Sequence, residues 1–168
     1  VIIFQIYILE SLLKFFFMQK LSTILVLNGP NLNLLGLREK SFYGNKTLED
    51  INVELNTILD KKYFLIDFFQ SNNEGELIEK IHEAINTCSG LIINAGAYTH
   101  TSIALLDALK IFDKPIIEVH MSNIYGRDYF RRKSYISLVA DGSICGFGHL
   151  SYRIALNSIT KMMGYSNN

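Results

Sequence analysis

The sequence carries no excess of charge and very little cysteine. Its 168 residues contain 16 lysines and arginines against 16 aspartates and glutamates, so the net charge is close to zero. A broad nucleic-acid-binding surface needs a basic excess on one face, which this balance argues against. Cys88 and Cys145 have no CxxC spacing, so they predict two buried thiols in a reducing cytoplasm rather than a zinc or redox motif. We therefore expect a cytoplasmic protein whose partner is a small molecule or another subunit.

Several signatures of catalytic and nucleotide-binding folds are also missing. The chain has neither a P-loop nor a GxSxG nucleophile elbow, and no His, Cys or carboxylate set has the spacing of a metal site. Residues 146–151, GFGHLS, begin like a dinucleotide-binding fingerprint but lack its third glycine. No lysine stands at the end of a predicted strand, where an imine-forming residue would be expected. These absences leave acid–base chemistry without a metal or an organic cofactor.

The first seventeen residues differ from the rest of the chain. The run VIIFQIYILESLLKFFF is strongly apolar, but it is shorter than the ~20 residues of a membrane-spanning helix, and Glu10 and Lys14 interrupt it. No basic segment precedes the apolar part and no small-residue cleavage site follows it, so a secretory signal fits poorly. We interpret residues 1–17 as an extension outside the native domain, and residues 18–168, from Met18, as a single domain. A membrane anchor is the alternative for the extension.

From residue 21 onward, strand-like runs alternate with helical patterns. Runs of aliphatic and β-branched residues predict strands, and apolar residues three or four positions apart predict helices. A capping box, Thr47 with Asp50 three residues later, marks the start of the first helix. The predicted strands are 23–27, 63–69, 90–94, 115–120 and 142–148, and the later helices lie around 77–85, 102–111 and 151–163. The candidate core positions of the last helix are Ile154, Leu156, Ile159, Met162 and Met163.

This alternation predicts an α/β fold, with a parallel sheet covered by helices on both faces. In such folds, ligands bind beyond the carboxyl ends of the strands, near the point where the strand order reverses. The rule places the site in four segments of this chain, before any motif is considered. They are residues 28–44, 70–73, 94–102 and 120–132.

Polar side chains gather in these four segments. Glu118 and His120 lie two residues apart near the end of the fourth strand, hence on one face of it. Each group has a structural interpretation too: the asparagines as turn residues, the Glu–His pair as a strand-end hydrogen bond, and the arginines as a solvent-exposed face. Together, at one end of one sheet, they favour a site for a small, anionic, hydroxylated molecule. The other candidates are Asn28, Asn31, Asn94, His100, Ser122, Arg127, Arg131 and Arg132.

Five blocks of the sequence, taken in order, carry a family resemblance. They are LNGPNLNLLGLREKSFYG, FFQSNNEGELIEKIHEA, LIINAGAYTHTSIALLDAL, IIEVHMSNIYGRDYFRRKS and ICGFGHLSYRIAL, between about residues 21 and 163. In these blocks the chain resembles the type II 3-dehydroquinate dehydratases. The resemblance implies a flavodoxin-like three-layer sandwich with a five-stranded parallel sheet. It also implies a hydro-lyase of the shikimate pathway that removes water from 3-dehydroquinate through an enolate, giving 3-dehydroshikimate without a cofactor.

The resemblance also implies roles for individual residues. Tyr43 would take a proton from the carbon beside the ketone, and Arg38 would lower the pKa of Tyr43 from its ordinary ~10. The loop 28–44 would then be a lid that carries the base and its activator. His120 would be the general acid toward the departing hydroxyl, oriented by Glu118. The remaining roles are a water at the enolate held by Asn31, hydroxyl contacts from Asn94, His100 and Arg131, carboxylate contacts from the amides of Met121 and Ser122, and a contact from Asp107 of a neighbouring subunit.

The resemblance further implies a homo-oligomer, because the family assembles as trimers grouped into a dodecamer. Two other functions stay open on the sequence alone. A flavodoxin-like binding module could hold a nucleotide or phosphate at the turn 28–33, but it leaves the Arg38–Tyr43 and Glu118–His120 pairs unexplained. A receiver-type switch domain would require clustered acidic residues at the ends of the first strands, where this chain has amides.

Overall fold

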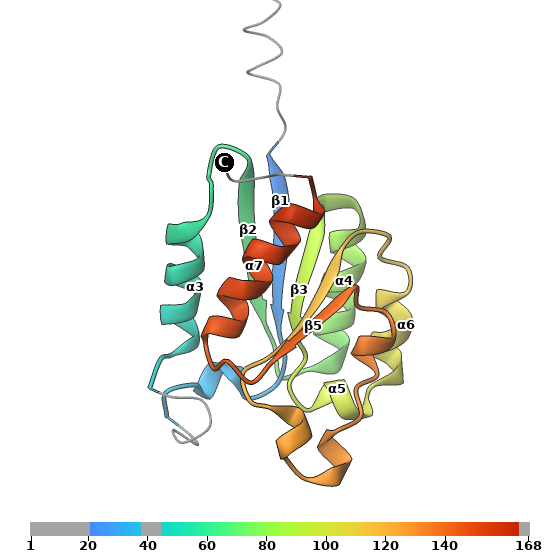
Figure 1. The fold of residues 1–168 in the computed structure, drawn as a ribbon. Coiled ribbons are helices and arrows are strands. Elements are labelled where there is room, and N and C mark those ends of the chain that lie inside the picture. Colours follow the sequence, from blue (N-terminus) through green and yellow to red (C-terminus); the bar gives the residue numbers. More distant parts are fainter. Residues whose placement is uncertain (1–20, 38–44, 165–168) are drawn as a thin grey trace, which may run out of the picture.

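Five parallel strands form one sheet in the computed structural model, which describes residues 21–37 and 45–164 (Figure 1). Their order across the sheet is β2-β1-β3-β4-β5. The chain passes from β1 to one neighbour, β2, and then back to the other, β3, so the strand order reverses between β1 and β3. The predicted fold class is confirmed. The strands are β1 (Ser22–Asn28), β2 (Phe64–Gln70), β3 (Gly90–Asn94), β4 (Ile116–His120) and β5 (Gly142–Cys145).

Helices cover both faces of the sheet (Figure 1). The helices α3 (Leu48–Ile58) and α7 (Leu150–Met162) pack on one face, and α4 (Glu74–Thr87) and α6 (Ile103–Leu109) on the other. Successive residues of β1 therefore serve opposite cores, since side chains alternate along a strand. Ile24 and Val26 contribute to the first core, Leu25 and Leu27 to the second. A strand buried on both faces needs the continuous apolar run that the sequence shows here.

The predicted capping box fixes the start of α3. Thr47 Oγ1 accepts a hydrogen bond from the Asp50 amide at 3.1 Å, and Asp50 Oδ2 accepts one from the Thr47 amide at 2.9 Å. Both amides would otherwise lack a partner at the helix N-terminus. The short elements between the main helices and strands are α5 (Tyr98–Thr101) and four 3₁₀ turns, η1 (Leu32–Leu34), η2 (Ile124–Gly126), η3 (Tyr129–Arg131) and η4 (Ile136–Leu138). None of the helices in the described part of the chain has the length and apolar character needed to cross a membrane.

Two predicted core positions are wrong. Ile154 and Met162 are 37% and 46% exposed. Helical spacing identifies an apolar stripe, but the sheet covers only the part of it that faces inward, where Leu55 and Leu156 are buried. The cysteine prediction is correct for Cys88 and wrong for Cys145, which is partly exposed. The last strand also ends earlier than predicted, because Gly146 turns the chain with φ of 93°.

Replacing Gly29 with alanine is expected to lower the free energy of unfolding by about 1–3 kcal/mol. The Gly29 amide donates to Asn94 O at 2.8 Å, so the loops after β1 and β3 touch at this point. A Cβ on Gly29 would lie 2.3 Å from Ala95 O, and backbone would have to move to admit it. Urea unfolding followed by circular dichroism measures the loss.

Gly142→Ala is the matched control for this substitution. A Cβ at Gly142 meets no atom within 4 Å, so we expect a change within about 0.5 kcal/mol. Equal stability of the Gly29 and Gly142 variants would show that the two loops can separate without cost.

Candidate active site

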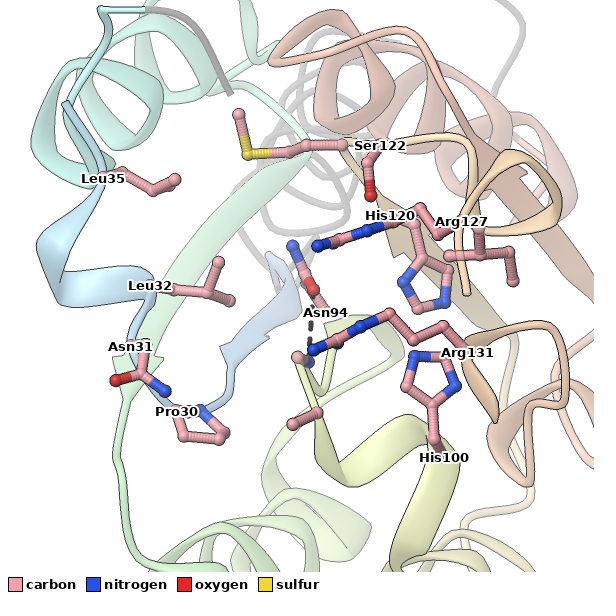
Figure 2. A pocket seen from close by; sticks show the side chains of 14 residues that line it. Pro30, Asn31, Leu32, Leu35, Asn94, His100, His120, Ser122, Arg127 and Arg131 are labelled. Carbon is pink, nitrogen blue, oxygen red and sulfur yellow. Dashed lines mark hydrogen bonds between the residues drawn. The ribbon is translucent and has the colours of Figure 1, made fainter. Parts of the chain in front are cut away.

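A cavity of about 260 Å³ lies at the carboxyl ends of β1, β3 and β4, beside the strand-order reversal (Figure 2). Residues from 30–35, 94–100 and 120–131 line it, and they belong to three of the four predicted segments. The segment 70–73 does not line the cavity, because β2 lies at the edge of the sheet beyond β1. It supports the wall instead, since Asn72 Oδ1 accepts a hydrogen bond from the Asn31 amide at 2.8 Å.

His120 and Glu118 form a buried pair at the end of β4. His120 Nε2 lies 2.8 Å from Glu118 Oε1, and the two side chains are 6% and 0% exposed. Because an ionised carboxylate only accepts hydrogen bonds, Nε2 carries the proton and Nδ1 is left for a further partner. His120 itself lines the cavity. The pair can therefore hold a proton and deliver it to a ligand.

Two serine hydroxyls hold the Glu118 carboxylate from other elements. Ser134 Oγ donates to Oε1 at 2.6 Å, and Ser143 Oγ, from β5, donates to Oε2 at 3.1 Å. Burial by itself raises the pKa of Glu118, but the hydrogen bonds from His120 and the two serines outweigh it. The pKa therefore lies below its ordinary value of 4.5, and Glu118 is ionised at neutral pH.

Replacing Glu118 with glutamine is expected to flatten the acid side of the stability curve. Since the folded-state pKa is lowered, the ionised carboxylate stabilises the fold above pH 4.5, and this contribution is lost as the pH falls through the folded-state pKa. Between about pH 5 and pH 2, the free energy of unfolding should fall more steeply in the wild type than in the variant. Denaturant unfolding at several pH values measures both slopes.

The exposed Glu79, on the outer face of α4, provides the control for that measurement. Glu79→Gln should follow the wild-type curve. Parallel curves for the wild type and the Glu118 variant would contradict the prediction. They would mean that the hydrogen-bond partners of Glu118 do not lower its pKa in the folded state.

His100, on α5, contributes a hydrogen-bond acceptor to the cavity. Its Nδ1 lies 2.7 Å from Lys133 O, and a carbonyl only accepts, so Nδ1 carries the proton and Nε2 has the lone pair. Burial lowers the pKa of His100, which favours the neutral ring. The rings of His100 and His120 stack with centroids 6.3 Å apart. An acceptor nitrogen in the wall suits a ligand hydroxyl.

Two arginines give the cavity a positive wall. Arg127 and Arg131 both line it (Figure 2) and are partly buried, whereas Arg132 is exposed and lies outside the lining. Arg131 Nε is buried and has no hydrogen-bond acceptor among the described residues; the Asp128 carboxylate is 3.9 Å away. No carboxylate side chain belongs to the described lining. The charge balance therefore favours an anionic ligand.

Two asparagines lie on different walls of the cavity. Asn94, at the end of β3, is buried and accepts a hydrogen bond from the Gly96 amide at 3.3 Å (Figure 2). Asn31 is exposed and has φ of 67°, a left-handed conformation that asparagine tolerates better than most residues. Met121 and Ser122 continue the wall after His120. Amide, hydroxyl and guanidinium groups thus surround a space that fits one small polar molecule rather than a nucleotide.

The structure does not bring every predicted site residue together. Asp107, on α6, is exposed, pairs with Lys110 at 2.9 Å and does not line the cavity. Its predicted contact with a neighbouring subunit remains a prediction. Arg38 and Tyr43 lie outside the described residues. Within residues 21–37 and 45–164, no three His, Cys, Asp or Glu side chains are grouped so that they could hold a metal ion.

Sequence reasoning missed three polar residues that support the site. Ser134 and Ser143 hold Glu118, as described above. Tyr152, on α7, is fully buried, and its hydroxyl accepts a hydrogen bond from Asn94 Nδ2 at 2.9 Å. The only sequence signal for such a role is a tyrosine within an apolar helical stripe, whose hydroxyl must find a partner when it is buried.

Known proteins share this sequence and this fold. Residues 22–160 match the family model described as dehydroquinase class II. The chain is 53% identical over 140 residues to the 3-dehydroquinate dehydratase of Prochlorococcus marinus, an alignment that covers 83% of this chain and 97% of that protein. Over 134 residues it is 52% identical to the 3-dehydroquinate dehydratase 2 of Pseudomonas aeruginosa, covering 80% of this chain and 90% of the relative.

Solved structures agree with these sequence matches. The type II dehydroquinase of Butyrivibrio crossotus superposes with a TM-score of 0.80 at 43% identity, covering 83% of this chain and 98% of that one. The type II dehydroquinase of Propionibacterium acnes has the same TM-score at 37% identity. A family match over most of the chain, relatives covered over 90% or more of their own length and a shared fold all lead to one assignment. The chain belongs to the class II dehydroquinase family.

Proposed function

We propose that the cavity binds 3-dehydroquinate and eliminates water from it, giving 3-dehydroshikimate as a step of the shikimate pathway. The observation that carries the proposal is the buried His120–Glu118 pair at one wall of a cavity with two arginines and no carboxylate in its described lining. A proton donor beside an anion-binding wall is what the elimination of a hydroxyl from a carboxylic acid requires. Family membership supports the identity of the substrate, since the relatives carry the name 3-dehydroquinate dehydratase.

The reaction divides into two proton transfers. A base takes the proton from the carbon beside the ketone, and the electron pair is delocalised onto the ketone oxygen as an enolate. The enolate then expels the hydroxyl, which leaves as water with a proton from His120. Glu118 holds the imidazole ring in position for the transfer. We assign the base to Tyr43 and its activation to Arg38, on the family resemblance alone.

The other lining groups bind and orient the substrate. Arg131, Asn94 and the neutral His100 suit the substrate hydroxyls, because together they offer donors and one acceptor nitrogen. The backbone amides of Met121 and Ser122 suit the carboxylate, and Asn31 would hold a water at the enolate oxygen. Assembly into trimers and a dodecamer, with Asp107 reaching a neighbouring site, is proposed on the same family resemblance.

The test is the full chain mixed with 3-dehydroquinate, with ultraviolet absorbance recording the conjugated enone of the product. We expect absorbance to rise at a rate proportional to protein concentration. Borohydride in a parallel sample should leave activity unchanged, because no lysine belongs to the described lining and no imine is expected to form. No product from a folded wild type would reject the enzyme. Tight nucleotide binding by calorimetry would then support the binding module.

A further inference from the structure

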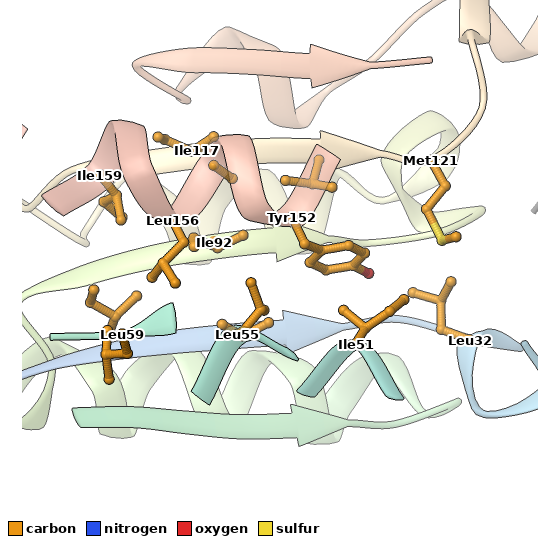
Figure 3. Close-up of a cluster of buried hydrophobic side chains, with 14 of the residues drawn as sticks. Leu32, Ile51, Leu55, Leu59, Ile92, Ile117, Met121, Tyr152, Leu156 and Ile159 are labelled. Carbon is orange, nitrogen blue, oxygen red and sulfur yellow. The ribbon is translucent and has the colours of Figure 1, made fainter. Parts of the chain in front are cut away.

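Tyr152 links two asparagines beneath the cavity. Asn28 and Asn94 are register partners at the carboxyl ends of β1 and β3. Tyr152 Oη donates to Asn28 Oδ1 at 2.6 Å and accepts from Asn94 Nδ2 at 2.9 Å. Figure 3 shows the ring among the core side chains between α7 and the sheet, with its hydroxyl directed toward the strand ends, where Leu32 and Met121 lie. The three side chains are 1%, 4% and 0% exposed for Asn28, Asn94 and Tyr152.

Asn94, Tyr152 and Asn28 thus form a hydrogen-bonded relay. Its hydrogen bonds run in one direction, from Asn94 through Tyr152 to Asn28. An amide nitrogen only donates and an amide oxygen only accepts. The tyrosine hydroxyl therefore donates its proton to Asn28 Oδ1 and accepts a hydrogen bond from Asn94 Nδ2. Burial raises the pKa of Tyr152 well above its ordinary value. The hydroxyl therefore keeps its proton throughout the neutral range, and the direction of the relay does not change with pH.

This relay determines how the Asn94 amide is oriented. Nδ2 is committed to Tyr152, and Oδ1 accepts from the Gly96 amide at 3.3 Å. A reversed amide would place Oδ1 against a hydroxyl that already donates to Asn28, and Nδ2 against the Gly96 N–H. Both contacts would then be unsatisfied in a buried place, which is costly. The second Nδ2 hydrogen and the remaining Oδ1 lone pair stay available where Asn94 lines the cavity.

The residue before Tyr152 ties the same helical turn to a third strand. Ser151 Oγ, which is fully buried, donates to His120 O at 3.1 Å. The first turn of α7 thus contacts the ends of β1, β3 and β4, the three strands whose loops line the cavity. The polar side chains of this turn form hydrogen bonds to the strand ends. Leu156 and Ile159, further along the helix, pack in the hydrophobic core.

We propose that Tyr152 is a positioning residue: its hydroxyl, fixed by Asn28, holds the Asn94 amide in the orientation that recognises a substrate hydroxyl. The recognition of substrate rests on the proposed function. The orientation of the amide does not, and it can be measured separately.

Tyr152→Phe in the full chain removes the hydroxyl and keeps the ring. We expect kcat/KM for 3-dehydroquinate to fall about tenfold, mainly through KM, because the lost contact serves binding. In the Asn94→Ala background, the same substitution should change kcat/KM less than about twofold. An equal loss in both backgrounds would mean that Tyr152 acts on the fold alone and would overturn the proposal. Wild-type constants for Tyr152→Phe would also overturn it.

A second readout follows the amide itself. In protein labelled with ¹⁵N-asparagine, Asn94→Ala identifies the side-chain signal of Asn94, and Tyr152→Phe should shift this signal and speed its hydrogen exchange. Asn28→Ala removes the acceptor of the tyrosine proton and should also change the Asn94 signal. This variant tests the proposal even if Tyr152→Phe does not fold. An unchanged Asn94 signal would overturn the proposal. A wild type without turnover would reject only the proposed function.

Tyr63→Phe is the matched control for both readouts. Tyr63 is partly buried next to the start of β2, at the opposite end of the sheet from the cavity. It should leave both the kinetic constants and the Asn94 signal unchanged. A comparable change in this variant would show that removing any tyrosine hydroxyl disturbs the site.

Discussion

Replacing His120 with glutamine is expected to lower kcat by about 10²–10⁴-fold, because the departing hydroxyl loses its proton donor. Glutamine can still donate a hydrogen bond toward Glu118 but cannot deliver a proton. The interaction matters in the transition state rather than in the bound substrate, so KM should change much less than kcat. Initial rates over a range of 3-dehydroquinate concentrations separate the two constants.

His82→Gln is the control for this variant. His82 lies on α4, is exposed and is remote from the lining of the cavity. It should keep wild-type constants, while thermal unfolding checks that the His120 variant is folded. If His120→Gln kept more than about a tenth of kcat, the acid would have to be another group, and the buried pair with Glu118 would be a structural hydrogen bond.

The strands and the first helix could be predicted because their signals are local. The run of β3, GLIIN, is apolar up to Asn94 because helices cover both of its faces, and the capping box of Thr47 joins residues only three positions apart. The predicted core of α7 failed at Ile154, because spacing along a helix does not tell how wide a strip the sheet covers. The short helix α5, YTHT, was missed because four residues are too few to show a period.

The site was predictable as far as the strand-end rule reaches. It placed Asn94, His100 and His120 around one cavity, and this arrangement needs only the order of the elements. It could not distinguish Arg127 and Arg131, which line the cavity, from Arg132, because the direction of a loop side chain depends on tertiary contacts. Tyr152 was out of reach for a similar reason. Its partner Asn28 is 124 residues away in the sequence, and only the packing of α7 on the sheet brings them together.

Replacing Tyr43 with phenylalanine is expected to reduce kcat by about 10²–10⁴-fold or more, since the reaction loses the group proposed to abstract the first proton. The same variant should keep its affinity for a non-reacting substrate analogue within a few-fold, because the ring is retained. Tyr98→Phe is the control: the Tyr98 hydroxyl donates to Asn72 O at 3.0 Å, away from the cavity lining, and its loss should have little effect on kcat.

The described residues offer one rival for the role of base, and the Tyr43 experiment decides between them. His100 is neutral and has an unprotonated Nε2 in the cavity wall, so its geometry alone would permit it to accept a proton. As a base, however, it would become an imidazolium at a partly buried position, where desolvation already lowers its pKa, in a cavity lined by two arginines. That environment disfavours the positive charge that a neutral base acquires when it takes a proton. It favours an anionic base such as a phenolate. We therefore expect His100→Gln to raise KM and keep most of kcat. If instead His100→Gln abolished turnover and Tyr43→Phe did not, the base would be the histidine and the first step would need a new description.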